Sequence, residues 1–585
     1  PADLYTRMAY VRENHWKLTH LLNYNQTFYK HDIGMLLGFE EERFVKRTTD
    51  TAKLGLIDSS VGDPSSATTP SSIGGTGEEF TSRSYFGRIN YAFDSRYLFE
   101  VNMRYDGSSR FAPDNRWGLF PSFSAGWRIS EEKFMKGLPI DNLKLRASWG
   151  KLGNNAIGNY EWQAVYNSAK YAFGGSLNNG LAITSISNNL LEWESTAITN
   201  IGIDFATLRN RLTFEAEFYN KVTDGILYRP DMYMSLGTAS GPRQNIAEVT
   251  NRGIEMTLNW QDRIGKVEYR VSGNFAYNQN KVSKYKGELQ RGWVTDENGN
   301  RVYQTNIGDV STGGSTRVIE GKMINEYYML QPYKGNGNGF NADGTVNING
   351  GPRDGMIRTV DDMKWLNAMV GAGYKFYPRQ NVSKSGIWYG DYIYADLNGD
   401  GVYGNDADNE FQGCSNVPKY NFGLQASANW KGFDFSMNWS GAAGFKIYYY
   451  RLALNSSATI KGYAIGEAIA NDHYFFDPKN PNDPRTNLSS KNPRLTNNSG
   501  NDQSGMTQSS VHLQKGDYIK LKNLTIGYTL PAVLSKKVYA QNIRFFASGE
   551  NLFTITGYEG MDPEMRTAVG YSTMRQYAFG VNITF

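Results

Sequence analysis

The last nine residues of the chain, Tyr577-Ala-Phe-Gly-Val-Asn-Ile-Thr-Phe585, decide the fold class. Every odd position carries an aromatic or aliphatic side chain, and every even position a small or polar one. A period of two is typical of a β-strand with one apolar and one polar face. Aromatic density on one face, continued to a terminal Phe, favours a strand of a transmembrane β-barrel, whose outer face meets lipid.

The same alternation recurs along the chain. From Tyr97 to Tyr105 the odd positions are apolar, whereas the even positions between them are Glu100, Asn102 and Arg104. A sandwich core cannot bury such charges unpaired, but a water-filled lumen accepts them. Similar segments lie at 117–129, 143–149, 212–218, 254–260, 420–430 and 433–439.

We count about 14 strands by this alternation and predict an all-β fold, a transmembrane antiparallel β-barrel. The alternative is a soluble sheet whose aromatic faces form a core, but one sandwich seldom takes so many strands. No run of about 18 apolar residues predicts a membrane helix, and the mean hydropathy is −0.54.

Composition and motifs exclude several function classes. The net charge of +4, from 61 basic and 57 acidic residues, gives no case for nucleic acid. One cysteine and five scattered histidines offer neither a disulfide nor a thiolate or histidine metal site. No GxSxG motif or phosphate-binding loop is present, so we expect no enzyme.

The connections alternate between short and long. Short turns are expected at 94–96, 209–210 and 431–432, and long ones at 48–80, 106–116, 152–190, 228–250, 283–413 and 451–510. Barrels of this kind have short periplasmic turns and long extracellular loops. Segments 48–80 and 485–510 are rich in Ser, Thr, Gly and Asn and are predicted to be flexible loop.

Several long motifs carry a family resemblance. One is Gly516-Asp-Tyr-Ile-Lys-Leu-Lys-Asn-Leu-Thr-Ile-Gly-Tyr-Thr-Leu-Pro531. The others lie at 84–100, 104–111, 117–128, 145–155, 548–556 and 558–564, with the terminal Phe585. Together they resemble the SusC/RagA family of TonB-linked outer-membrane transporters.

The resemblance implies part of a 22-stranded barrel closed by an N-terminal plug. Residues 1–585 are expected to be its C-terminal portion, because no TonB box or plug is found and 16–47 already alternates like a hairpin. The plug and roughly eight strands would then lie in another segment or chain.

The family also implies a function. This is TonB-dependent import of oligosaccharides with a SusD-like surface lipoprotein as lid and the TonB complex acting through the plug. The barrel itself would contact membrane lipid and lipopolysaccharide. An oligopeptide importer of the same family, or a passive pore or structural barrel, is the alternative.

A possible cation site follows from Asp396-Leu-Asn-Gly-Asp-Gly401, which matches the first half of an EF-hand calcium loop. Position 12 is Ala407 rather than a bidentate carboxylate, and an Asx-rich turn without metal is the alternative. The predicted Ca²⁺ ligands are Asp396, Asn398, Asp400, Val402, Asp406 and Asp408.

Aromatic loop residues are the candidates for substrate binding, because their rings can stack on sugars or peptide side chains. They are Tyr160, Trp162, Tyr166, Trp293 and Tyr448. The alternative is a place in the aromatic girdle or in a loop core.

Overall fold

The computed structural model describes residues 4–56, 58, 60–228, 242–285, 289–295, 301–308, 316–317, 320–449, 470–495, 508–566 and 571–585. Within these residues fifteen strands make up the main antiparallel sheet, in line with the predicted count of about 14. The chain divides into two compact units, Pro1–Leu258 with Ser283–Lys286 and Asn259–Val282 with Gly287–Phe585, which are described separately. None of the described helices is both long and apolar enough to cross a membrane.

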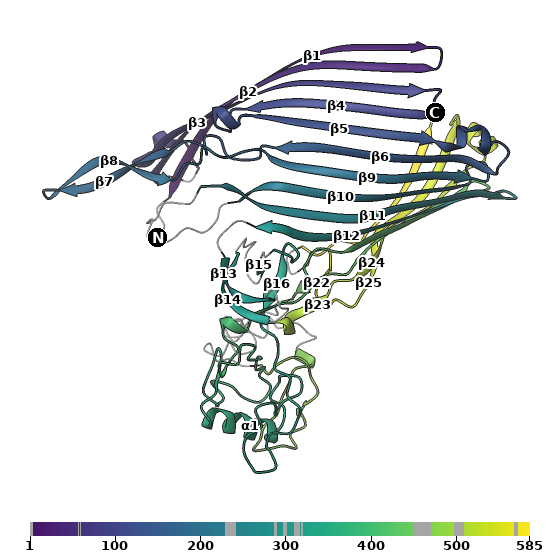
Figure 1. The fold of residues 1–585 in the computed structure, drawn as a ribbon. Coiled ribbons are helices and arrows are strands. Elements are labelled where there is room, and N and C mark those ends of the chain that lie inside the picture. The colour runs from purple at the N-terminus through teal and green to yellow at the C-terminus, as the bar shows by residue number, and fades with distance from the viewer. Residues whose placement is uncertain are drawn as a thin grey trace. The chain divides into compact units, whose positions relative to one another are not determined.

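The first unit is a sheet of long strands in chain order (Figure 1). Each of these strands pairs antiparallel with its neighbour in the sheet, as the alternation predicted. The strands are β1 (Tyr5–Phe28), β2 (His31–Leu56), β3 (Ala67–Phe93), β4 (Tyr97–Ser108), β5 (Trp117–Arg128), β6 (Ile140–Asn154), β9 (Glu194–Thr207), β10 (Leu212–Tyr228) and most of β11 (Gln244–Ile264).

The short turns predicted at 94–96 and 209–210 are present. Asp94 and Ser95 adopt left-handed backbone angles, φ 50° and 55°, and Asn210 does so with φ 57°. Asp and Asn tolerate this region because their short side chains hydrogen-bond locally. Both turns therefore reverse the chain within a few residues.

The loop predicted at 48–80 is wrong for most of its length. Strands β2 and β3 continue through it, with Thr48 opposite Thr76 and Leu56 opposite Ala67, so only 57–66 connects them. The Ser, Thr and Gly content suggested a loop, but Thr is a good strand former and ladder hydrogen bonds do not depend on side chains. The paired backbone, rather than composition, decides the structure here.

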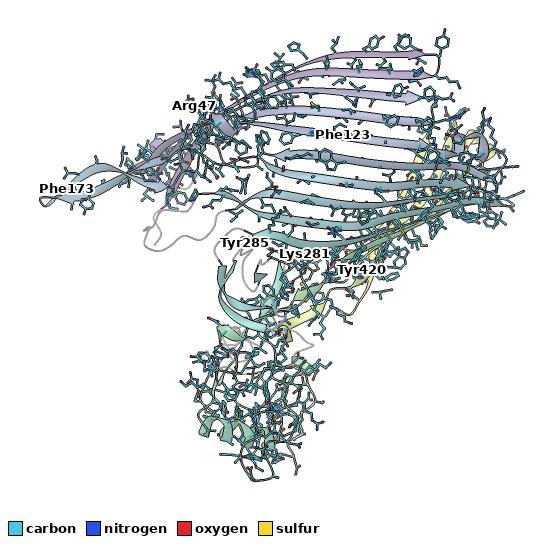
Figure 2. All side chains as sticks on the ribbon, viewed as in Figure 1. Arg47, Phe123, Phe173, Lys281, Tyr285 and Tyr420 are labelled. Carbon is cyan, nitrogen blue, oxygen red and sulfur yellow. The ribbon has the colours of Figure 1, made fainter. Side chains whose placement is uncertain are left out.

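The apolar face of this sheet carries two rows of rings, with aliphatic residues and further rings between them. Figure 2 labels Phe123 of β5, which lies between the rows. In one row Tyr105 stacks on Trp117 with ring centroids 4.8 Å apart, and in the other Phe93 stacks on Tyr97 at 6.3 Å. Exposed aliphatic and aromatic side chains between the rows include Leu37, Ile89, Val101, Met103 and Phe123. An apolar band between two aromatic girdles is the pattern of a lipid-facing barrel wall.

The second unit contains the remaining long strands and most of the loop structure. Its long strands are β12 (Val267–Tyr285), β20 (Tyr420–Trp430), β21 (Phe433–Ala443), β24 (Tyr518–Thr529), β25 (Asn542–Thr556) and β26 (Gln576–Thr584). The predicted turn at 431–432 is present, with Lys431 and Gly432 both at positive φ. On β26 the odd residues are exposed, as the C-terminal alternation predicted.

The connection between β12 and β20 is an ordered structure rather than a plain loop. It holds α1 (Val360–Gly371), which begins at a capping box of Thr359 and Asp362. The other short elements of this unit are β13 (Leu289–Thr295), β14 (Arg301–Gly308), β15 (Thr316–Arg317), β16 (Glu326–Met329), β17 (Lys375–Phe376), β18 (Val402–Tyr403), β19 (Glu410–Phe411), β22 (Lys446–Tyr448), β23 (Leu513–Lys515) and α4 (Ala532–Ser535).

A hydrophobic cluster holds α1, β17 and β18 together. Trp365 and Met369 of α1 are fully buried in it, together with Phe376 and Tyr394. Tyr474, from the connection between β21 and β24, belongs to the same cluster. Two connections that are distant in sequence thus share one core. Residues 451–469 and 496–507 of the predicted loop 451–510 lie outside the described part.

Candidate functional site

The polar face of the first unit carries a row of side chains in exact strand register. Asn90 on β3 lies opposite Glu100 on β4, which lies opposite Ser124 on β5. The row continues through Ser148 on β6 to Asn200 on β9. Two amide side chains, two serines and the Glu100 carboxylate thus form one polar row across a wall of five neighbouring strands.

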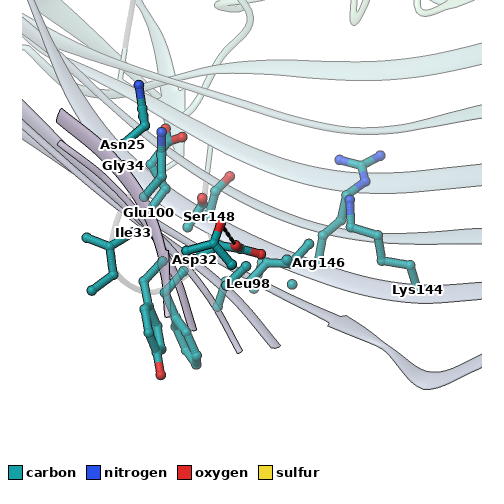
Figure 3. A pocket seen from close by; sticks show the side chains of 18 of the residues that line it. Asn25, Asp32, Ile33, Gly34, Leu98, Glu100, Lys144, Arg146 and Ser148 are labelled. Atoms are coloured by element: carbon teal, nitrogen blue, oxygen red, sulfur yellow. Dashed lines mark hydrogen bonds between the residues drawn. The ribbon is translucent and has the colours of Figure 1, made fainter. Parts of the chain in front are cut away.

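A cavity of about 580 Å³ opens on this wall (Figure 3). The polar row lines it, and Leu98 and Ile33 add apolar surface. Among the described residues, the amide oxygens of Asn90 and Asn200 are buried without a hydrogen-bond partner. The lining of the cavity thus combines amide side chains with the small hydroxyl groups of Ser124 and Ser148.

Charged side chains at the edge of this cavity are paired within the wall. Arg146 Nε donates to Asp204 Oδ1 at 3.0 Å, and a second nitrogen of Arg146 bonds Glu217. Lys144 Nζ lies 3.8 Å from Asp204. Figure 3 shows Lys144 and Arg146 side by side on β6. The carboxylates of Glu100 and Asp32 also line the cavity, and they accept hydrogen bonds from the neutral side chains of Asn102 and Thr27.

A second cavity, of about 360 Å³, contains one of the predicted binding residues. Tyr160 lines it together with Lys46, Thr48, Thr76 and Glu78, and Gly77 and Asn159 complete it. The Tyr160 hydroxyl accepts a hydrogen bond from the backbone N–H of Glu79 at 2.8 Å. This bond holds the phenol end of the ring, while the side chain stays partly exposed at 39%.

Two side-chain hydrogen bonds and one cation–π contact hold the loop around Tyr160. Arg110 Nε donates to Asn159 Oδ1 at 3.1 Å, and its guanidinium lies 4.6 Å from the ring centroid of Phe80. Trp162 Nε1 donates to the Ser109 carbonyl at 3.3 Å. Trp162 therefore helps to anchor the loop, and Tyr160 is the aromatic residue that faces the cavity.

The other three predicted aromatic residues lie elsewhere. Tyr166 is exposed on β7 (Val165–Phe173), which pairs with β8 (Ser176–Ser185) in a hairpin extending from the sheet (Figure 1). Trp293 is in β13, and its side chain lies outside the described part of the chain. Tyr448, in the second unit, packs edge-on against His512 with centroids 5.9 Å apart.

In the predicted cation loop the carboxylates bond the loop's own backbone. Asp396 accepts from the N–H groups of Gly399 at 2.7 Å and Gly401 at 2.9 Å. Asp400 accepts from the N–H of Val402 at 2.8 Å and from the Asn398 amide at 2.9 Å. Hydrogen bonds from backbone N–H groups to Asp side chains are the pattern of an Asx turn, and they stabilise this turn without a metal ion.

Asp408 is the most buried group of this loop. It is fully buried at the end of the short helix Asp406–Asp408 and accepts three backbone hydrogen bonds, from Leu397, Gly404 and Asn405. Burial raises the pKa of Asp408 to about 6, and the backbone donors oppose the shift. Within the described ranges no group of three or more His, Cys, Asp or Glu could hold a metal. The calcium site stays a prediction.

Apart from Tyr160, sequence reasoning missed the residues that line the two cavities. Asn90, Glu100 and Ser124 are ordinary polar residues on separate strands. Alternation indicated that each lies on a polar face, but it does not state which residues meet across strands. The register brings them into one row.

Comparison with known proteins gives one family match. Residues 3–552 match the family model described as TonB dependent receptor-like, beta-barrel. The chain is 29% identical to TonB-dependent receptor P39 of Formosa agariphila, over 96% of the chain and 52% of that protein. It is 28% identical to TonB-dependent receptor SusC of Bacteroides thetaiotaomicron, over 86% of the chain and 43% of that protein.

A solved structure shares the fold. The RagAB peptide importer in its open-open state superimposes with a TM-score of 0.74 at 21% identity, over 99% of this chain and 55% of that one. The chain spans about half the length of the curated relatives it matches. The predicted resemblance to the SusC/RagA family is confirmed.

Proposed function

Because the chain belongs to the TonB dependent receptor-like β-barrel family, we propose that it forms the wall and outer loops of an oligosaccharide importer. Its fold is that of an outer-membrane β-barrel, and its apolar band between aromatic girdles faces lipid. Energy would come from the TonB complex acting through a plug domain.

The observation that carries the choice of cargo is the chemistry of the polar face. Both cavities combine hydroxyl and amide groups, and the 360 Å³ cavity adds the Tyr160 ring. Lys46 pairs with Glu13 at 2.7 Å, and Arg146 with Asp204 and Glu217. Hydroxyl and amide groups beside an aromatic ring suit a hydroxyl-rich ligand, because aromatic faces and polar groups fix its orientation.

The cargo is tested by binding calorimetry on the full-length receptor. A panel of neutral oligosaccharides is compared with a panel of peptides of similar mass. We expect binding from the oligosaccharide panel. Thr48→Val with Thr76→Val should weaken it by about 2 kcal/mol, or about thirtyfold, since each hydrogen bond contributes ~1 kcal/mol. Binding of peptides alone would identify a peptide importer instead.

We propose a SusD-like lipoprotein as the lid, docked partly on the hairpin of β7 and β8. One face of this hairpin exposes four large apolar side chains, those of Tyr166, Leu177, Leu181 and Ile183. The opposite face carries Tyr171 and Phe173 among small and polar residues. Exposed apolar surface of this kind typically marks a protein interaction site.

The lid is tested by pull-down of the lipoprotein with hairpin variants. Leu177, Leu181 and Ile183 are changed together to Ser, and the matched control changes Tyr171 and Phe173 on the other face to Ser. We expect only the first variant to lose the partner. If both variants retain the lipoprotein equally, this face of the hairpin is not the docking surface. A receptor that transports without any lipoprotein would favour an independent channel.

A further inference from the structure

Two sequence motifs near the C-terminus carry opposite halves of one buried ion cluster. Lys520, on β24, lies in the motif 516–531, and Asp562 and Glu564 both lie in the loop motif 558–564. Lys520 Nζ donates to Asp562 Oδ2 at 2.6 Å and to Glu564 Oε2 at 2.8 Å. Lys520 is only 2% exposed, and Asp562 is also buried. The proposed transport function does not use this cluster.

The geometry fixes the loop in both position and orientation. Asp562 Oδ1 accepts the backbone N–H of Glu564 at 2.9 Å, and the N–H of Met565 bonds the Asp562 carbonyl at 3.1 Å. The two carboxylates therefore project from one tight turn onto a single ammonium group. Lys522 adds a bond to Glu564 at 2.7 Å but is far more exposed.

The charges of the cluster determine whether the turn stays closed, even if the cluster adds little to the free energy of unfolding. A buried ion pair is often no more stabilising than an apolar replacement, but loss of one partner leaves a buried charge unpaired. Without the Lys520 ammonium, the buried Asp562 carboxylate would lose its ion partner, whereas the partly exposed Glu564 would keep Lys522 and the Tyr518 hydroxyl. The turn would then move away from β24 so that water can solvate Asp562.

A second set of contacts holds the beginning of the same loop independently. Gln514 Nε2 donates to Glu559 Oε2 at 3.1 Å, and the N–H of Glu559 donates to Gln514 Oε1 at 3.0 Å. Thr556 Oγ1 donates to the Asp517 carbonyl at 2.8 Å. These bonds involve no cation, so they persist when Lys520 is neutralised. The Tyr558 hydroxyl likewise donates to the Arg566 carbonyl at 2.8 Å, so movement is expected between these two anchors, at residues 560–565.

We propose that Lys520 is an ionic latch that closes the turn at 562–566 against β24. The latch is shut while the ammonium bridges Asp562 and Glu564, and it opens when either side loses its charge. It is a property of the barrel wall and loop alone, and it does not depend on the cargo or on a lid. The two motifs are thus two parts of one device.

Hydrogen exchange on the full-length receptor in detergent tests the latch. The reporters are the hydrogen-bonded amides of Glu564 and Met565. We expect Lys520→Met to accelerate their exchange at least about tenfold, because an unpaired buried charge is strongly unfavourable. Lys520→Arg should keep the slow exchange. Arg544→Met is the control, since Arg544 pairs with Asp434 instead, with Nε to Oδ1 at 2.9 Å.

Two outcomes would overturn the latch. One is an exchange rate in Lys520→Met within about twofold of wild type, or an equal acceleration in the Arg544 control. The other uses the double variant Asp562→Asn with Glu564→Gln, which removes both carboxylates. This variant also tests the latch if Lys520→Met does not fold. This pair should open the turn, and adding Lys520→Met to it should slow exchange again because no charge stays unpaired. Additive acceleration in the triple variant contradicts ionic coupling.

Discussion

Replacing Val101 with Arg probes the lipid-facing wall most directly. Val101 lies four residues from Tyr97 and four from Tyr105, which belong to the two rows of rings. At about 3.3 Å per residue, each ring is ~13 Å away, so Val101 sits near the middle of an apolar band about 25 Å tall. Its neighbours across the ladder, Ile89 and Phe123, are exposed apolar residues as well.

The expected cost follows from this depth. An Arg at the midplane of an outer-membrane barrel costs about 2–4 kcal/mol, and the cost falls to ~0–1 kcal/mol near the interfaces. Val101→Arg should therefore shift the folding equilibrium by about 30- to 900-fold. Met103→Arg, two residues nearer the Tyr105 row, should cost less. Asn102→Arg should cost little, because Asn102 lies on the polar face and bonds Glu100 at 2.7 Å.

Reversible denaturant unfolding in lipid vesicles measures these free energies. The full-length receptor and its three Arg variants are compared under the same conditions. A cost at position 102 equal to that at 101 would mean that the strand faces are assigned wrongly. Equal costs at 101 and 103 would mean that Val101 is not at the midplane.

Three further predictions concern the loops. Because burial raises the pKa of Asp408 above its unfolded value, the stability of its loop should fall as the pH rises from about 4 to about 6, by ~3 kcal/mol. Hydrogen exchange of residues 396–408 should show this trend, and Asp408→Asn should abolish it; a rise in protection over that window would contradict the sign. If the loop holds Ca²⁺, adding the ion should raise its melting temperature and Asp400→Ala should cancel the gain; no shift in either protein refutes the site. Tyr160→Ala should weaken oligosaccharide binding by ~1–3 kcal/mol through loss of stacking, whereas Tyr160→Phe should retain most of it, and calorimetry that finds both variants at wild-type affinity would exclude Tyr160 from the site.

Within the candidate site, the sequence predicted only a residue whose side chain by itself indicates binding, which is the aromatic loop residue Tyr160. Tyr160 was chosen because an aromatic loop residue can stack on a ligand, and the structure places it beside a cavity. Thr48 and Thr76 were assigned to a loop, and they face that cavity because β2 and β3 are longer than composition suggested. Trp162 carried the same signal as Tyr160, but it donates to the Ser109 carbonyl and helps to anchor the loop.

The sequence by itself determined the strand pattern, the two faces of each strand and the family, because alternation and motifs are local properties of the chain. Only the tertiary structure decided which strands continue through 48–80 and which polar residues share a row. It also revealed a bulge at Lys522, where two consecutive polar residues interrupt the alternation and the ladder shifts between Leu521 and Asn523. The partnership of Lys520 with Asp562 spans 42 positions. Such contacts depend on strand register and loop closure, which no short window of sequence specifies.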